Sequence, residues 1–166
     1  MPGQPGPSTT SSSPAGAGAA FAFACDFRIL AESAGFNLAF TGIGLSCDSG
    51  SSWTLPRLVG WAKARELLLR PRTVRAAECL DLGLATEVVP DAEVPTRAAD
   101  LARELAAGPT VAYGAVRSVL AFSASHSLAE SLAHEGEMMS FTGATDDHRS
   151  AVAAFLAKEK PEFRGR

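Results

Sequence analysis

The stretch AGAGAAFAFACDFRI, from Ala15 to Ile29, decides how this chain folds. Its first six residues are only alanine and glycine, and glycine lets a backbone come close to another segment or to a ligand. Close packing is the commoner use of such small residues, and catalysis is the rarer one. Periodicity alone does not decide whether a short apolar run is a buried helix or a buried strand. The stretch therefore predicts where the folded core begins and leaves its secondary structure open.

Residues 1–14 precede this stretch and differ from it sharply in composition. They contain only Met, Pro, Gly, Gln, Ser and Thr. Such a segment cannot bury enough apolar surface to offset the entropy that a chain loses on folding. We therefore expect a disordered leader over residues 1–14.

Residues 15–90 carry signals for both strands and helices. Alternating side chains predict short strands at Phe27–Ile29 and Ala34–Phe36, and a last strand at Ala85–Val89 between a glycine and a proline. Between these strands, Trp61–Arg70 has the charge spacing of a helix. The fold class predicted for this part of the chain is α/β.

Residues 91–166 are predicted to form a helical region. A first helix has apolar residues at helical spacing and ends at Gly108, while Ser127 and Glu130 form a capping box that starts a later helix. The apolar residues that mark helical faces are Val94, Ala98, Leu101, Leu105, Leu128, Leu132 and Met139. Those expected to be buried are Leu101, Leu105, Val152, Phe155 and Leu156.

Composition and charge narrow the classes of function. The 166 residues are 46% hydrophobic and 20% charged, with a formal net charge of -3, as expected for a globular domain. No run of like charges offers a surface to nucleic acid or to an anionic membrane. No segment approaches the roughly eighteen apolar residues of a membrane span. We therefore expect neither a nucleic-acid partner nor a membrane partner.

The cysteines and histidines do not have the pattern of a metal site. Cys25, Cys47 and Cys79 are isolated, which fits neither a CxxC motif nor a disulfide framework. We expect reduced thiols in a cytoplasmic protein. The three histidines also lack the spacing of metal ligands, so no metal is expected.

Asp48 is the acidic residue with the strongest case for a chemical role. It lies in GLSCDSGSSW, residues 44–53, where a carboxylate beside apolar residues can act as a proton shuttle. The same position suits an N-cap, because an aspartate there can accept backbone hydrogen bonds at the start of a helix. The residues alone leave both roles open.

Several motifs, in order along the chain, resemble those of the crotonase superfamily of enoyl-CoA hydratases and isomerases. The first is the stretch quoted above, with Pro14 before it. The others are FTGIGL at 40–45, DSGSSW at 48–53, LPRLVG at 55–60, AAE at 76–78, GL at 83–84, VVP at 88–90, DDHR at 146–149 and AAFLAKEKPEF at 153–163. The resemblance covers nearly everything after Pro14.

The resemblance implies a fold and an assembly. The fold is a crotonase-like spiral of strand-strand-helix turns, of which this chain has the second half only, as a partial core over residues 15–90. Residues 91–166 are similar to the helical region through which family members form trimers, so a homotrimer or hexamer is implied. The family's N-terminal half, with much of its CoA-binding surface, would lie before Pro14.

The resemblance also implies chemistry that needs no cofactor. Family members bind an acyl-CoA thioester and stabilise its enolate-like oxygen with an oxyanion hole of two backbone N–H groups. One of these N–H groups would belong to Ala17, with Gly16 and Gly18 beside it against the substrate. The two glutamates of the hydratases fall on Ala20 and Phe40, neither of which can move a proton.

Isomerase subgroups similar to this sequence carry one acidic residue at the position of Asp48. The resemblance therefore implies an acyl-CoA isomerase in which Asp48 is the catalytic base that removes a proton and returns it. The alternative is a binding or assembly module of the same fold, which is catalytically incomplete because it lacks the N-terminal half.

Overall fold

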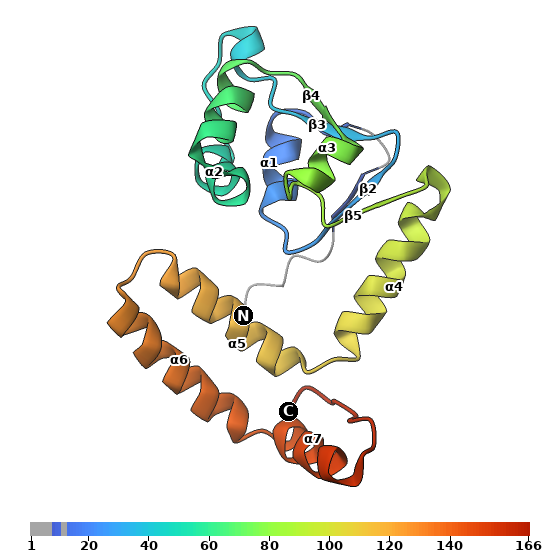
Figure 1. Ribbon diagram of the computed structural model, residues 1–166, viewed down its shortest axis with the longest axis vertical. Helices are drawn as coiled ribbons and strands as arrows, with labels where there is room; N and C mark the ends of the chain where they lie inside the picture. The colour runs from blue at the N-terminus through green and yellow to red at the C-terminus, as the bar shows by residue number, and fades with distance from the viewer. Residues whose placement is uncertain (1–7, 11–12) are drawn as a thin grey trace. The chain divides into compact units, whose positions relative to one another are not determined.

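A computed structural model of the chain describes residues 8–10 and 13–166 (Figure 1). These residues form two compact units, one reaching to Ala102 and the other running from Arg103 to Arg166. The boundary falls inside helix α4 (Val94–Ala106), which contributes to both units. Each unit is described by itself below.

The first unit is built on two small β-sheets. One is parallel, with strand order β1-β2-β5, and the other is the antiparallel pair of β3 and β4. The strands span Ser8–Thr10 (β1), Arg28–Ala31 (β2), Gly35–Asn37 (β3), Thr73–Arg75 (β4) and Glu87–Val89 (β5). All four residues of β2 are buried, as expected for the middle strand of a sheet.

Three helices pack with these strands around one hydrophobic core (Figure 1). They are α1 (Ala17–Phe23), α2 (Ser51–Leu69) and α3 (Ala76–Asp81), and two short 3-10 turns cover Thr41–Ile43 and Asp91–Glu93. Phe23 of α1 meets Phe36 of β3 edge to face, with 4.9 Å between the ring centroids. Such a pair adds a directional contact to the apolar burial and orients α1 on the sheet.

A buried arginine ties the end of α1 to the turn before β5. Arg28 is only 5% exposed. Its Nε donates to the Leu84 carbonyl at 2.8 Å and its Nη1 donates to the Cys25 carbonyl at 2.5 Å, with a longer contact to Gly83. Burial lowers the pKa of this guanidinium. The hydrogen bonds to the carbonyl oxygens offset the free-energy cost of burying its charge.

The second unit is a set of three helices. They are α5 (Thr110–Ser123), α6 (Leu128–Gly143) and α7 (Asp146–Ala157), with α5 and α6 packed as a hairpin. The predicted capping box is confirmed, since the Ser127 side chain accepts from the Glu130 N–H and the Glu130 side chain accepts from the Ser127 N–H. Asp147 is buried and accepts from the Arg164 and Gly165 N–H groups at 2.7 and 2.9 Å, which folds the C-terminal tail back onto α7.

The secondary structure settles one open question and differs from the expectation at two places. The start of the small-residue stretch, open between helix and strand, is a helix from Ala17. Ser8–Thr10 forms β1 and pairs with β2, which contradicts a disordered leader at these residues, while residues 1–7 and 11–12 lie outside the described part. Strand β4 was not predicted, because Thr73–Arg75 is short and gains its partner only from β3. Long-range pairing of this kind is invisible to local pattern.

The expected burial of the last helix is wrong for this chain taken alone. Leu101 is buried and Leu105 is half-buried, but Phe155 is 80% exposed, and Val152 and Leu156 are exposed as well. The apolar residues of the α6 face are also exposed, namely Leu128, Leu132 and Met139. Helical periodicity shows which side chains share a face, whereas burial depends on whether another surface covers that face.

Among the described residues, no single helix is long and apolar enough to cross a membrane. The one pair of helices that meets the length and composition test together is interrupted between Ala106 and Thr110.

Candidate active site

The small-residue run is held against strand β3 by a short parallel bridge. The Asn37 N–H donates to the Pro14 carbonyl at 3.1 Å, and the Gly16 N–H donates to the Asn37 carbonyl at 2.9 Å. Gly16 has φ 53° and ψ -124°, a conformation that glycine adopts far more readily than other residues. The bridge and this glycine set the direction in which α1 begins at Ala17.

The first turn of α1 leaves one backbone donor available. Gly18 donates its N–H to the Ala15 carbonyl at 3.1 Å, and Ala20 donates to the Gly16 carbonyl at 3.2 Å. No acceptor in the part of the chain that the structure describes pairs with the N–H of Ala17, which is half-buried. The first N–H groups of a helix have no partner within the helix, so this one can bind an oxygen supplied by a ligand.

The two positions at which the resemblance implies hydratase glutamates, Ala20 and Phe40, lie near the start of α1. Ala20 is one helical turn further along α1 and is completely buried. Phe40 is 7% exposed, and its ring edge would be 3.6 Å from a Cβ placed on Gly16. Both side chains are apolar, and neither can accept or donate a proton.

Asp48 stands in a tight turn immediately before α2. Its carbonyl oxygen accepts from the Ser51 N–H at 2.9 Å and from the Ser51 hydroxyl at 2.8 Å. The residues between them, Ser49 and Gly50, have φ values of 51° and 83°. The N-cap of α2 is Gly50, and no side chain caps this helix. The capping role that the sequence left open for the Asp48 carboxylate is therefore wrong, since only the backbone of Asp48 takes part.

Helices α1 and α2 are fixed on the same core (Figure 1). Ala19 and Phe23 of α1 and Leu55 and Leu67 of α2 all belong to its buried cluster. The N–H of Ala17 and the turn that carries Asp48 are therefore mounted on two packed elements of one unit. A site built on packed helices holds its geometry better than one on a free loop.

Apolar side chains are exposed around the Asp48 turn. Asp48 itself is exposed, and Leu45 and Trp53 on either side of it are more than half exposed. Arg57 stacks its guanidinium 3.3 Å above the Trp53 ring and donates to the Trp53 carbonyl at 2.9 Å. An apolar group of a ligand or of another protein segment could cover this surface.

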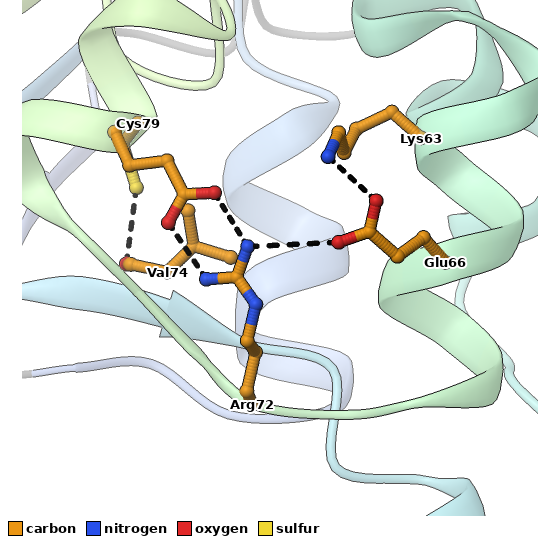
Figure 2. A network of polar contacts seen from close by, with 6 residues as sticks. Lys63, Glu66, Arg72, Val74 and Cys79 are labelled. Carbon is orange, nitrogen blue, oxygen red and sulfur yellow. Dashed lines mark hydrogen bonds and ion pairs between the residues drawn. The ribbon is translucent and has the colours of Figure 1, made fainter.

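A network of charged side chains joins α2 to α3 (Figure 2). Arg72 binds both carboxylate oxygens of Glu78 and lies 3.8 Å from Glu66, which also pairs with Lys63 at 2.6 Å. The Arg72 guanidinium lowers the pKa of the Glu78 carboxyl, so this carboxylate is charged and occupied rather than available as a base. The network therefore has a structural role, which is to join α2 to α3.

The cysteines and histidines are explained without a metal. All three cysteines are free thiols, and burial raises the pKa of Cys79 to about 11, so it is not a nucleophile near neutral pH. His126 stacks on Phe122 at 3.6 Å, and His134 lies 3.2 Å from the Ser118 hydroxyl. No group of three or more metal-ligating side chains occurs among the described residues. The cytoplasmic location stays a prediction.

Two residues that shape the site escaped the sequence analysis. Asn37 acts through its backbone, which any residue could supply, so no sequence signal marks it. Ser51 left a signal in the Ser-Gly-Ser sequence after Asp48, because a Ser-Gly pair is typical of a tight turn.

Comparisons with known proteins show which family the chain resembles. The family model described as enoyl-CoA hydratase/isomerase matches residues 11–166. A "Probable enoyl-CoA hydratase" of Rhodobacter capsulatus is 40% identical over 159 residues, which are 96% of this chain and 62% of the relative. The 1,2-epoxyphenylacetyl-CoA isomerase of Escherichia coli is 37% identical over 152 residues, covering 92% of this chain and 58% of the isomerase.

The fold is shared with solved structures as well. The crystal structure of an enoyl-CoA hydratase/isomerase from Cupriavidus metallidurans superposes with a TM-score of 0.90 at 29% identity, covering 96% of this chain and 60% of that one. This confirms the α/β crotonase-like fold, while the comparisons leave the subgroup unresolved. The chain spans about three-fifths of the length of the relatives it matches. It belongs to the enoyl-CoA hydratase/isomerase family.

Proposed function

We propose that this chain carries the proton-transfer part of an acyl-CoA isomerase site. The Asp48 carboxylate removes a proton from the carbon alpha or gamma to the thioester carbonyl of an enoyl-CoA. The electron pair moves onto the thioester oxygen, giving an enolate that accepts a hydrogen bond from the Ala17 N–H. The same carboxyl then returns the proton to the other carbon, so the double bond moves and nothing is consumed.

One observation carries this proposal: a backbone N–H without a described acceptor lies in the same part of the fold as two apolar residues. The Ala17 N–H is unpaired among the described residues, while the two positions that hold glutamates in hydratases are the apolar Ala20 and Phe40. Adding water to a double bond needs groups that activate and deliver the water, and these positions supply none. A single carboxylate at Asp48 is enough for a proton to be moved within one substrate.

The oxyanion hole needs a second donor, and Gly16 and Gly18 flank the first. By resemblance to the family, the second N–H belongs to a segment that precedes residue 14. The substrate is a coenzyme A thioester and no cofactor takes part in the proposed reaction. The similarity to the Escherichia coli 1,2-epoxyphenylacetyl-CoA isomerase supports an isomerase.

Acyl-CoA binding and turnover, measured on this chain and on an N-terminally extended version, test the proposal. We expect the extended version to isomerise a 3-enoyl-CoA to the conjugated 2-enoyl-CoA. The rise in absorbance of the conjugated thioester measures this reaction. Little hydration should accompany it, as judged by loss of that absorbance. Rapid hydration without isomerisation would contradict the assignment of Asp48 as a lone base.

A second candidate function is an assembly module, favoured by the exposed apolar faces of α6 and α7. Phe155 and Leu156 on α7 and Met139 on α6 are each more than 70% exposed. A homotrimer or hexamer would cover such faces. Sedimentation velocity tests this, with self-association expected at micromolar concentration. A stable compact monomer would count against the assembly role.

A further inference from the structure

The turn that follows Asp48 places a residue other than glycine, Ser49, at a positive φ of 51°. Ser49 and Lys158 are the only non-glycine residues with positive φ in the part of the chain that the structure describes. Residues with a side chain avoid this left-handed region because Cβ crowds the neighbouring carbonyl oxygen. Lys158 ends a helix, where such a residue is common. Ser49 lies directly beside the proposed base.

Ser51 holds this turn closed from the inside. Its side chain is completely buried, and its N–H and hydroxyl both donate to the Asp48 carbonyl, at 2.9 and 2.8 Å. A carbonyl oxygen has two lone pairs, so the oxygen of Asp48 is fully occupied. Ser51 is also the first residue of α2, which Leu55 anchors in the core. The position of the Asp48 backbone is thereby tied to the core.

The carboxylate of Asp48, unlike its carbonyl oxygen, is not held by other groups among the described residues. It is exposed, and no hydrogen bond or ion pair joins its carboxylate to the described residues. A helix cap would use the carboxylate and leave the carbonyl free for the helix. Here the carbonyl is held and the carboxylate is left available, as a group that must reach a substrate requires. Strained backbone of this kind gathers at functional sites, where the surroundings maintain it.

We propose that the Ser49–Ser51 turn positions the Asp48 carboxylate for proton transfer, with Ser51 as the positioning residue. This inference rests on the proposed role of Asp48 as the base. The left-handed conformation at Ser49 points the chain back so that Ser51 reaches the Asp48 carbonyl. Loss of either feature leaves Asp48 present but poorly placed.

Three substitutions separate positioning from stability. Ser51→Ala removes one donor. Ser49→Val disfavours the left-handed conformation, and because Ser49 is exposed it leaves the core untouched. Ser49→Gly permits that conformation and removes only the side chain. Ser52→Ala is the matched control, since this neighbouring serine is exposed.

Backbone order parameters from 15N relaxation of the 166-residue chain give a readout that does not need turnover. At residues 48–50 we expect order parameters of about 0.85, as for rigid backbone, in the wild type, Ser49→Gly and Ser52→Ala. In Ser51→Ala and Ser49→Val we expect these order parameters to fall below about 0.6. Amides of the core strand β2 should not change. Unchanged values at 48–50 in both of these variants, or a loss spread over the first unit, would overturn the proposal.

Isomerase kinetics of the N-terminally extended version, with Asp48→Asn alongside, show which of the two proposals fails. In Ser51→Ala and Ser49→Val we expect kcat to fall about tenfold to a hundredfold with KM nearly constant, the effect of a misplaced catalytic group. If Asp48→Asn abolishes turnover while these two variants keep it, the positioning role is wrong and the base is right. If Asp48→Asn keeps turnover, the proposed base is wrong.

Discussion

Arg28 offers the sharpest test of how the first unit is held together. Replacing it by methionine retains an unbranched side chain at this buried position but removes every donor. The Leu84 and Cys25 carbonyls, which receive bonds of 2.8 and 2.5 Å, would lose a charged donor. A hydrogen bond to a charged group contributes roughly 1.5–3 kcal/mol. Two such bonds sum to roughly 3–6 kcal/mol, and because the cost of burying the charge disappears with it, we predict a net loss of about 2–4 kcal/mol.

Urea unfolding of the chain, followed by circular dichroism, measures this loss. Arg28→Lys should fall between the wild type and Arg28→Met, because an ammonium retains the charge but cannot reach both carbonyls in the plane of a guanidinium. Arg70→Met is the matched control, since Arg70 is exposed, and should stay within about 0.5 kcal/mol of the wild type. A loss under roughly 1 kcal/mol for Arg28→Met would refute the reasoning, because the carbonyls would then have found water or other donors.

Three further predictions concern exposure and titration. Phe155→Ala should lower the stability of the monomer by less than about 1 kcal/mol in urea unfolding, because the ring is 80% exposed, and a loss above 3 would show that the face is covered. The Ser33 hydroxyl and N–H lower the pKa of Asp91, so their contribution to stability is present at neutral pH and is lost as the pH falls through that lowered pKa. Ser33→Ala should flatten this part of the stability profile between about pH 5 and 2, and an unchanged profile would argue against the contact. Cys79, with its pKa raised to about 11, should be alkylated more slowly at pH 7.5 than the two half-buried cysteines, as read by peptide mass spectrometry, and equal rates would contradict its burial.

The sequence predicts the local elements of this fold better than their pairing. Strands β2, β3 and β5, helix α2 and the capping box at Ser127 follow from alternation, helical spacing and turn residues. Strands β1 and β4 are three residues each and take their stability from partners far along the chain. The exposure of Phe155 could not be predicted for a related reason, because a sequence does not show which surface covers an apolar face.

In the candidate site, likewise, the sequence indicates the residue types but not their geometry. Asp48 and Ala17 were identified from motifs, and their roles remain proposals. The choice between a base and a cap at Asp48 could not be made from sequence, because both use the same residue type at the same place. It depends on the Ser49 conformation and on which atom of Asp48 receives the Ser51 donors, and these are properties of the folded turn.

The most direct test of the central claim is the turnover of Asp48→Asn in an N-terminally extended, complete version of the protein. Asparagine keeps the size of the side chain and the carbonyl that Ser51 holds, so folding and acyl-CoA binding should stay nearly intact. The account predicts a fall in isomerisation on the order of a hundredfold to ten-thousandfold, the usual contribution of a positioned acid or base. Full turnover in Asp48→Asn, with acyl-CoA bound as in the wild type, would contradict it.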